Sequence, residues 1–119
     1  MNINQLRKRL KYWQSMFGLT AWKITVSYVD LKEFQKDIND LAYGDIHYDD
    51  IQRVAKIRIV HPKYAAHFEE PLPKPNPEET IVHELLHLVT DPIVKKMGSD
   101  AHEQLINLLT KILTNKETQ

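Results

Sequence analysis

The first segment of the chain has apolar residues at helical spacing. Five of them recur every three or four positions, which places them on one face of a helix: Ile3, Leu6, Leu10, Trp13 and Phe17. Gly18 follows and suits the position just past a helix C-terminus. A basic cluster occupies the rest of this helix, and we expect it to be a solvated face: Arg7, Lys8, Arg9 and Lys11.

From Ala21 the period changes to two, since Trp22, Ile24, Val26 and Tyr28 alternate with polar residues. This alternation predicts a half-buried strand. Two more strand-like runs, Leu41–Tyr48 and Arg53–His61, are separated by a polar turn over residues 49–52, which predicts a β-hairpin. Between the first and second strands, Asp30–Asp40 is weakly periodic and predicts a short helix built around three apolar residues: Leu31, Phe34 and Ile38.

Prolines mark the middle of the chain as a loop that follows His61-Pro62 and includes Pro71, Pro73 and Pro75. A helix then begins, with Asn76 as N-cap, Pro77 at the first helical position and Glu79 at the third. We predict this helix from about Pro77 to Thr90, ending before Asp91-Pro92. Ser99 can cap a last helix over about Asp100–Thr114. The predicted class is α+β: an N-terminal helix, a small three-stranded sheet with a β-hairpin, and two C-terminal helices.

Composition narrows the classes of protein that fit. The length of 119 residues suits one domain over 1–119, and 42% hydrophobic with 27% charged residues is a globular composition. Lys and Arg together number 16, as do Asp and Glu, so the zero net charge argues against nucleic acid or an anionic membrane as a partner. The basic N-terminus has no apolar segment typical of a secretory signal, and no apolar run is long enough to span a bilayer. We therefore expect a cytoplasmic location and favour a monomer.

The chemistry is concentrated in His83-Glu84-Leu85-Leu86-His87. Residues four apart lie on one face of a helix, so both histidines can bind one Zn²⁺ ion. Glu84 is placed to take a proton from a water on that ion as the water attacks a carbonyl. With no cysteine in the chain, any metal must be held by histidine and carboxylate.

A catalytic zinc site needs a third protein ligand. The nearest suitable residues are Asp91, His102 and Glu103. Asp91 lies beyond the predicted helix end and precedes proline, which makes it the weakest candidate. His102 falls toward the apolar face of the last helix, whereas Glu103 lies off that face. We favour Glu103 over His102, and both remain open.

The segment Thr80–Leu88 resembles the extended signature of the zincin metallopeptidases. Other parts resemble the minimal gluzincin-type and SprT-like metallopeptidases of bacteria and phages: Gly18-Leu19 before Trp22-Lys23-Ile24, Ala55–Pro62, Pro77–Thr80 and the helix that begins near Glu103. The resemblance implies a zinc metallopeptidase. In gluzincins the third ligand is a glutamate, which carries over onto Glu103; in the SprT-like group it is a histidine, which carries over onto His102.

The resemblance has two further implications. Ile57–Val60 would be an edge strand above the active-site helix and would bind an extended peptide or protein substrate through backbone hydrogen bonds. Zincins often add a tyrosine or histidine that stabilises the oxyanion, and His61 is the first candidate, with Tyr43, Tyr48 and Tyr64 behind it. Two alternatives to a peptidase are a zinc-binding module without turnover and a SprT-like protein that binds nucleic acid through the basic first helix and Trp13.

Overall fold

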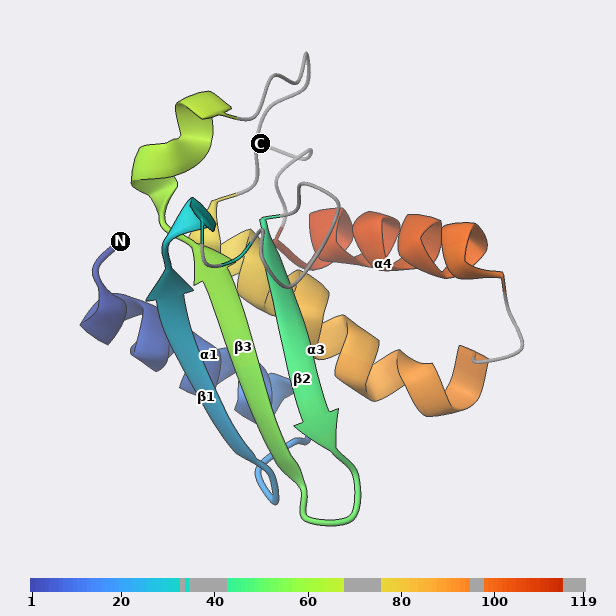
Figure 1. The fold of residues 1–119 in the computed structure, drawn as a ribbon. Helices are drawn as coiled ribbons and strands as arrows, with labels where there is room; N and C mark the ends of the chain where they lie inside the picture. The colour runs from blue at the N-terminus through green and yellow to red at the C-terminus, as the bar shows by residue number, and fades with distance from the viewer. Residues whose placement is uncertain (33, 35–42, 68–75, 95–97, 115–119) are drawn as a thin grey trace.

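The computed structural model describes residues 1–32, 34, 43–67, 76–94 and 98–114. Figure 1 shows the elements in chain order: α1 (Ile3–Met16), β1 (Lys23–Val29), β2 (Gly44–Asp49), β3 (Val54–Val60), the 3-10 helix η1 (Pro62–His67), α3 (Pro77–Val94) and α4 (Ser99–Thr114). The predicted α+β class, with one helix before a three-stranded sheet and two after it, is confirmed.

The sheet is mixed and has the order β1-β3-β2. β3 pairs with β2 in an antiparallel manner, so the predicted hairpin is confirmed, and it pairs in parallel with β1 along its whole length. The expectation that Ile57–Val60 is an edge strand is therefore wrong, because this segment lies in the central strand. The alternation in β3 shows which face is buried but carries no information about how many strands flank it. β2 is the edge strand on the side of the two C-terminal helices.

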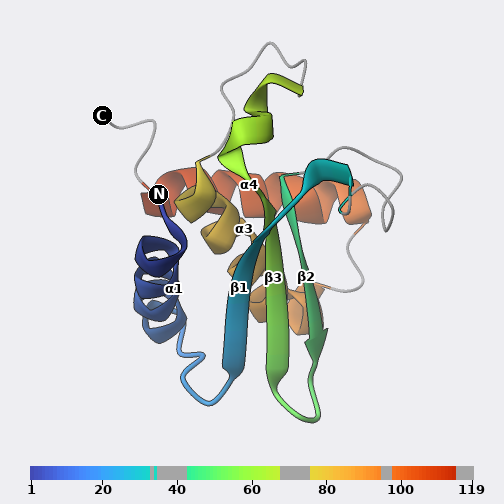
Figure 2. The same ribbon diagram turned by 60° about the vertical axis from the view of Figure 1, so that its left-hand side comes forward.

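One face of the sheet is covered by helices. Ala55, Ile57 and Ile59 of β3 are almost fully buried on this face, and Figures 1 and 2 show α1 and α3 on the same side of the sheet. The apolar faces of both helices contribute further buried residues to this core: Leu6, Leu10, Trp13, Ile81, Val82 and Leu85. The apolar residues predicted from the strand alternation and those predicted from the helical spacing thus pack together in one core.

A capping box and a glycine define the two ends of α1, and polar contacts join this helix to α3. Asn2 caps the helix reciprocally with Gln5, and Gly18, at a φ of 69°, ends it. Glu78 of α3 accepts hydrogen bonds from Arg9 Nε at 2.8 Å and from Trp13 Nε1 at 2.7 Å. Since Trp13 is buried and its N–H is bonded, it is not at the surface to stack on a nucleic-acid base.

Helix α3 starts as predicted and ends later. Asn76 Oδ1 accepts from Glu79 N at 2.9 Å, and Glu79 Oε1 accepts from Asn76 N at 3.1 Å, which forms a capping box. The helix then continues through Asp91-Pro92 to Val94, four residues beyond the predicted end. Proline in a last helical turn forfeits one backbone hydrogen bond without stopping the turn before it. Asp91 therefore lies one helical turn after His87.

Strand β2 lies against α3. A Cβ atom on Gly44 would stand 2.7 Å from both Arg58 O and Thr80 Cγ2, so this contact requires glycine. At the other end of the strand, Tyr48 OH donates to Asp91 Oδ2 of α3 at 2.6 Å. The edge strand is held along the helix that carries the His/Glu motif.

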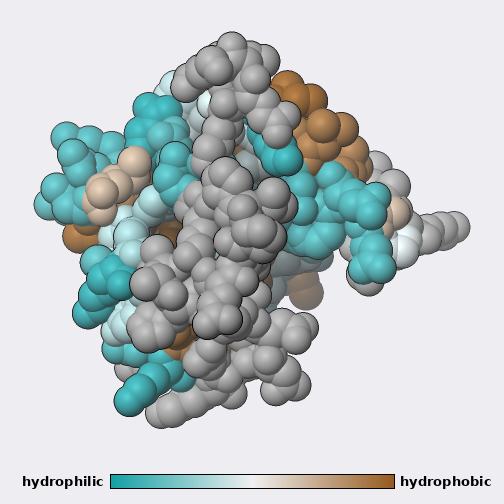
Figure 3. Space-filling view, turned by 90° about the horizontal axis from the view of Figure 1, so that it is seen from above, coloured by the Kyte–Doolittle hydropathy of each residue, from teal (hydrophilic) through white to brown (hydrophobic). Residues whose placement is uncertain are grey.

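Helix α4 begins at Ser99, and His102 N donates to Gly98 O, so Gly98 rather than Ser99 occupies the N-cap position. The helix packs chiefly against α3, with Ile106 fully buried. Its outer side exposes Leu108, Ile112 and Leu113, whereas much of the described surface seen from above in Figure 3 is hydrophilic. No helix in the described ranges is both long and apolar enough to cross a membrane.

Several predictions fall partly outside the described residues. Of the predicted short helix, Leu31, Lys32 and Phe34 are helical, while Ile38 lies outside; so do Leu41 and the prolines at 71, 73 and 75. Leu31 and Phe34 are buried with Val60 in a second small cluster. The 3-10 helix over Pro62–His67 replaces the first part of the predicted loop.

Candidate metal centre

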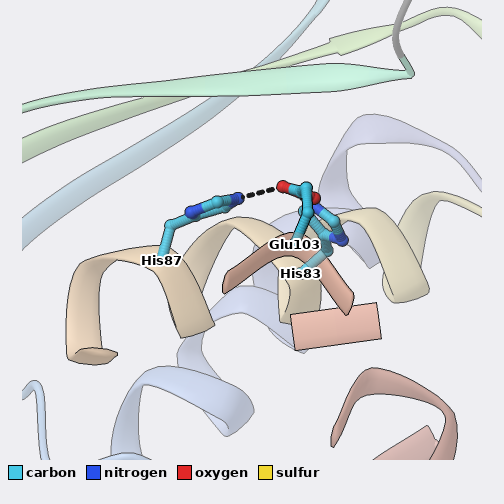
Figure 4. Close-up of side chains that lie close together, drawn as sticks. All are labelled: His83, His87 and Glu103. Carbon is cyan, nitrogen blue, oxygen red and sulfur yellow. Dashed lines mark hydrogen bonds and ion pairs between the residues drawn. The ribbon is translucent and has the colours of Figure 1, made fainter. Parts of the chain in front are cut away.

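Two histidines of α3 and a glutamate of α4 converge on one point (Figure 4). His83 and His87 are one helical turn apart, with ring centroids separated by 5.1 Å. Glu103 reaches across from α4, and its Oε1 lies 2.7 Å from His87 Nε2 and 3.2 Å from His83 Nε2. One ligand atom from each of the three residues lies within 4.8 Å of the others, and a metal ion bound by all three would replace the hydrogen bonds between Glu103 and the imidazoles.

This arrangement distinguishes between the residues considered as third partner of the histidine pair. Glu103 joins His83 and His87, whereas His102 points to Thr90 and Asp91, with its Nε2 at 2.8 Å from Thr90 Oγ1. The side chains of His83, His87 and Glu103 are 24%, 23% and 44% exposed, so the cluster is open to solvent on one side. A small ion can reach it without any rearrangement of the core.

The charges in the cluster suit a ligand set. Hydrogen bonds from the His83 and His87 imidazoles hold the pKa of the Glu103 carboxyl far below its ordinary value. Burial lowers the pKa of His87, but the hydrogen bond to Glu103 and the charges of Glu84 and Glu103 outweigh this, and its pKa is raised overall. The lowered pKa of Glu103 favours the ionised form that a ligand needs, and the raised pKa of His87 means that a metal competes there with a proton.

Glu84 lies beside these ligands in a very different environment. Its side chain is buried, and burial raises its pKa to about 7, although the nearby His83 and His87 act in the opposite direction. A carboxyl group with a pKa near neutrality can both accept and return a proton at physiological pH. The pKa of Glu84 is compatible with the general-base role predicted for it, and that role stays a prediction.

The residues considered for the oxyanion lie in different places. His61 is exposed, packs on Tyr28 of β1 with ring centroids 4.9 Å apart, and accepts from Lys63 N; none of these contacts leads to the cluster. Tyr64 donates to Asp30, and Tyr43 packs in the small cluster around Phe34. Tyr48 donates to Asp91, whose other oxygen, Oδ1, lies 3.8 Å from His87 Nδ1.

The link from Tyr48 to Asp91 was not predicted from the sequence. It depends on α3 continuing past Thr90 and on the seating of β2 along α3, which a single sequence does not report. One signal was present, because His87 and Asp91 have the spacing of neighbours on a helix.

Comparisons of the chain with protein-family models, with curated proteins and with solved structures found no match. What the structure establishes is a His-His-Glu cluster that can hold a metal ion, on an α+β fold.

Proposed function

We propose that this protein is a zinc-dependent metallopeptidase. The observation that carries the proposal is the meeting of Glu103 with His83 and His87, because it supplies the third ligand that a catalytic zinc site requires. Two imidazole nitrogens and one carboxylate oxygen are a donor set that suits Zn²⁺. Zn²⁺ bound there would polarise a substrate carbonyl and lower the pKa of a coordinated water.

The protein's own part in hydrolysis falls to Glu84. Its buried carboxylate lies next to the ligands in sequence and in space, and a pKa near 7 allows it to take a proton from the attacking water. The same group can then deliver that proton to the leaving amine nitrogen. His83, His87 and Glu103 hold the metal and take no proton themselves.

The substrate we propose is an extended peptide added to the free edge of β2. Within the described ranges, β2 pairs only with β3, so its other edge has backbone groups available. The contacts of Gly44 with Thr80 and of Tyr48 with Asp91 hold this edge along α3, close to the metal ligands. Of the residues considered for the oxyanion, Tyr48 is the one that these contacts favour over His61.

The test compares two carboxylate variants of the purified protein. Glu84→Gln should keep the zinc content of the wild type and lose about 10²–10⁴-fold in the rate of peptide hydrolysis, because the base is gone while the ligands remain. Glu103→Gln should lose the zinc ion held with His83 and His87, and the activity with it. Asp100→Asn, an exposed carboxylate on the same helix as Glu103, is the matched control and should keep both.

Zinc content by elemental analysis and cleavage of a mixture of unstructured peptides are the readouts. Undiminished hydrolysis by Glu84→Gln would show that Glu84 is not the base. Wild-type protein that holds zinc but cleaves no peptide in the mixture would favour the alternative of a zinc-binding module without turnover.

A further inference from the structure

A second group of metal-ligating side chains lies beside the first. His87, Asp91 and His102 each offer one ligand atom, and these atoms lie within 4.8 Å of one another. The side chains of Asp91 and His102 are 33% and 14% exposed, so the group is partly buried. The proposed peptidase mechanism uses neither Asp91 nor His102 as a metal ligand.

The spacing of these atoms is too wide for hydrogen bonds and suits a shared ion. Asp91 Oδ1 lies 3.8 Å from His87 Nδ1 and 3.7 Å from His102 Nε2. Hydrogen bonds between nitrogen and oxygen span about 2.7–3.2 Å. Ligands that each stand about 2.0–2.2 Å from one zinc ion are separated by roughly 3.3 Å or more. One carboxylate oxygen thus faces two ring nitrogens across a gap that a cation can fill.

Neighbouring groups orient these ligands. Tyr48 OH donates to the other oxygen of Asp91, Oδ2, at 2.6 Å, which leaves Oδ1 directed at the rings. Thr90 Oγ1 gives its own proton to Leu86 O and so accepts from His102 Nε2. A bound cation would take the place of that His102 proton without disturbing the bond from Thr90 to Leu86. The bond from Tyr48 to Asp91 is the kind of outer contact that is typical of metal ligands, whereas the Thr90 contact lies on the ligating nitrogen of His102 and would be given up when a cation binds.

His87 belongs to both groups through different atoms. Its Nε2 faces Glu103, and its Nδ1 faces Asp91. The two nitrogens point to different sides of the ring, so one imidazole can serve two ions, provided that the proton on Nδ1 leaves to solvent when the second ion binds.

We propose that His87, Asp91 and His102 form a second site for a divalent transition-metal ion such as Zn²⁺, bridged to the first by the imidazole of His87. Two imidazoles and one carboxylate favour Zn²⁺ over Mg²⁺ or Ca²⁺, which prefer oxygen. The second ion binds more weakly, because it must displace protons from two rings and because the two cations repel each other. This inference rests on the metal site of the proposed function for the first ion, but it does not require peptide hydrolysis.

The experiment counts Zn²⁺ bound per chain by equilibrium dialysis of metal-free protein. Wild-type protein should bind two ions, of which one is lost first as free zinc is lowered. Asp91→Asn on α3 and His102→Gln on α4 should each bind one. Glu103→Gln should weaken the other ion and keep the one at Asp91, while Asp100→Asn should bind two. Melting temperatures of the metal-free variants verify that each is folded, and two variants on different helices keep the test valid if one is not.

A wild-type stoichiometry of one that is unchanged in both Asp91→Asn and His102→Gln would overturn the second site while leaving the first in place. Two ions bound without hydrolysis of any peptide would contradict the proposed function and leave the second site supported. The two proposals can thus fail separately.

Discussion

Glu84 is a carboxyl group kept almost out of contact with water. Its pKa in the folded, metal-free protein is about 7, against an ordinary value of 4.5. Below pH 4.5 both the folded and the unfolded chain hold its proton, and this group has no effect on stability. Between pH 4.5 and 7 the folded chain holds more protons than the unfolded chain, so the free energy of unfolding falls as pH rises.

Glu84→Gln should remove this pH-dependent loss, because glutamine does not ionise. We expect the free energy of unfolding of the variant to exceed that of the wild type by up to about 3 kcal/mol above pH 7, and the difference to vanish toward pH 4.5. Urea denaturation in the presence of a chelator, repeated across this range, measures it. Parallel pH profiles for the two proteins would show that burial does not raise the pKa of Glu84.

His87 and Glu103 predict how zinc affinity depends on pH. The pKa of His87 is raised and that of Glu103 is lowered, so the proton that competes with the metal resides on the histidine. Affinity should therefore fall as the solution is made more acidic and His87 is protonated, by roughly tenfold per pH unit for each proton displaced. A competition titration with a chromogenic chelator measures this slope.

His47→Gln is the control for that titration. His47 is 65% exposed on β2 and contacts Asp45 rather than the metal ligands, so its removal should leave the slope unchanged. An affinity that does not vary between mildly acidic and neutral pH would exclude His87 as a ligand.

Gly44 is a point of close approach between β2 and α3. Gly44→Ala would bring a methyl group within 2.7 Å of a backbone oxygen of β3 and of the Thr80 side chain, so the strand must shift. We expect the free energy of unfolding to drop by about 1–3 kcal/mol, as for other overpacked sites. Thermal or urea unfolding measures this drop.

Gly98→Ala is the matched control, since a Cβ atom there would meet nothing within 4 Å. Because Gly98 is the N-cap of α4 and alanine caps less well than glycine, this variant should still cost about 0.5 kcal/mol, less than Gly44→Ala. Equal losses in the two variants would show that β2 does not rest on α3 as described.

The secondary structure was predictable to different degrees in different elements. Capping residues, turn residues and alternation are all local signals. They predict where α1 and α3 begin, at Ile3 and Pro77, and where the β2–β3 hairpin lies. The order β1-β3-β2 is not local, because parallel pairing joins segments separated by residues 30–53. The end of α3 was misplaced because proline disfavours but does not forbid a final helical turn.

The candidate site shows the same division. His83, Glu84 and His87 are recognisable because a helix brings positions four apart together. The choice of Glu103 over His102 depends on how α4 is rotated against α3, which the packing of Ile106 and its neighbours decides. Adjacent residues of one helix point about 100° apart, so a rotation of α4 by that angle would exchange Glu103 and His102. The sequence does not fix this rotation and left both residues open.

One helix of the molecule contacts the rest of the fold mainly through a single neighbouring helix. Among the described elements α4 packs chiefly on α3, and it leaves Leu108, Ile112 and Leu113 exposed. The His-His-Glu cluster spans this junction. A metal bound there would therefore link α4 to the rest of the fold.

Zinc should accordingly raise the thermal stability of the protein. At a free concentration 100 times the dissociation constant, binding to the folded state alone adds about 2.7 kcal/mol, and the melting temperature rises. Differential scanning calorimetry with and without zinc measures the shift. Glu103→Gln should lose the part of this shift that comes from the ion held by His83, His87 and Glu103, and an undiminished shift in that variant would place the stabilising ion elsewhere.

The free edge of β2 also bears on how copies of this protein meet. Two identical β2 strands that paired in an antiparallel manner about His47 would place Asp45 of each copy opposite Asp49 of the other. Asp45 is held by Arg58 of β3, so Asp49 alone adds negative charge at each end of that ladder. In this register, a peptide with a basic residue opposite Asp49 is therefore favoured at the edge over a second copy of β2.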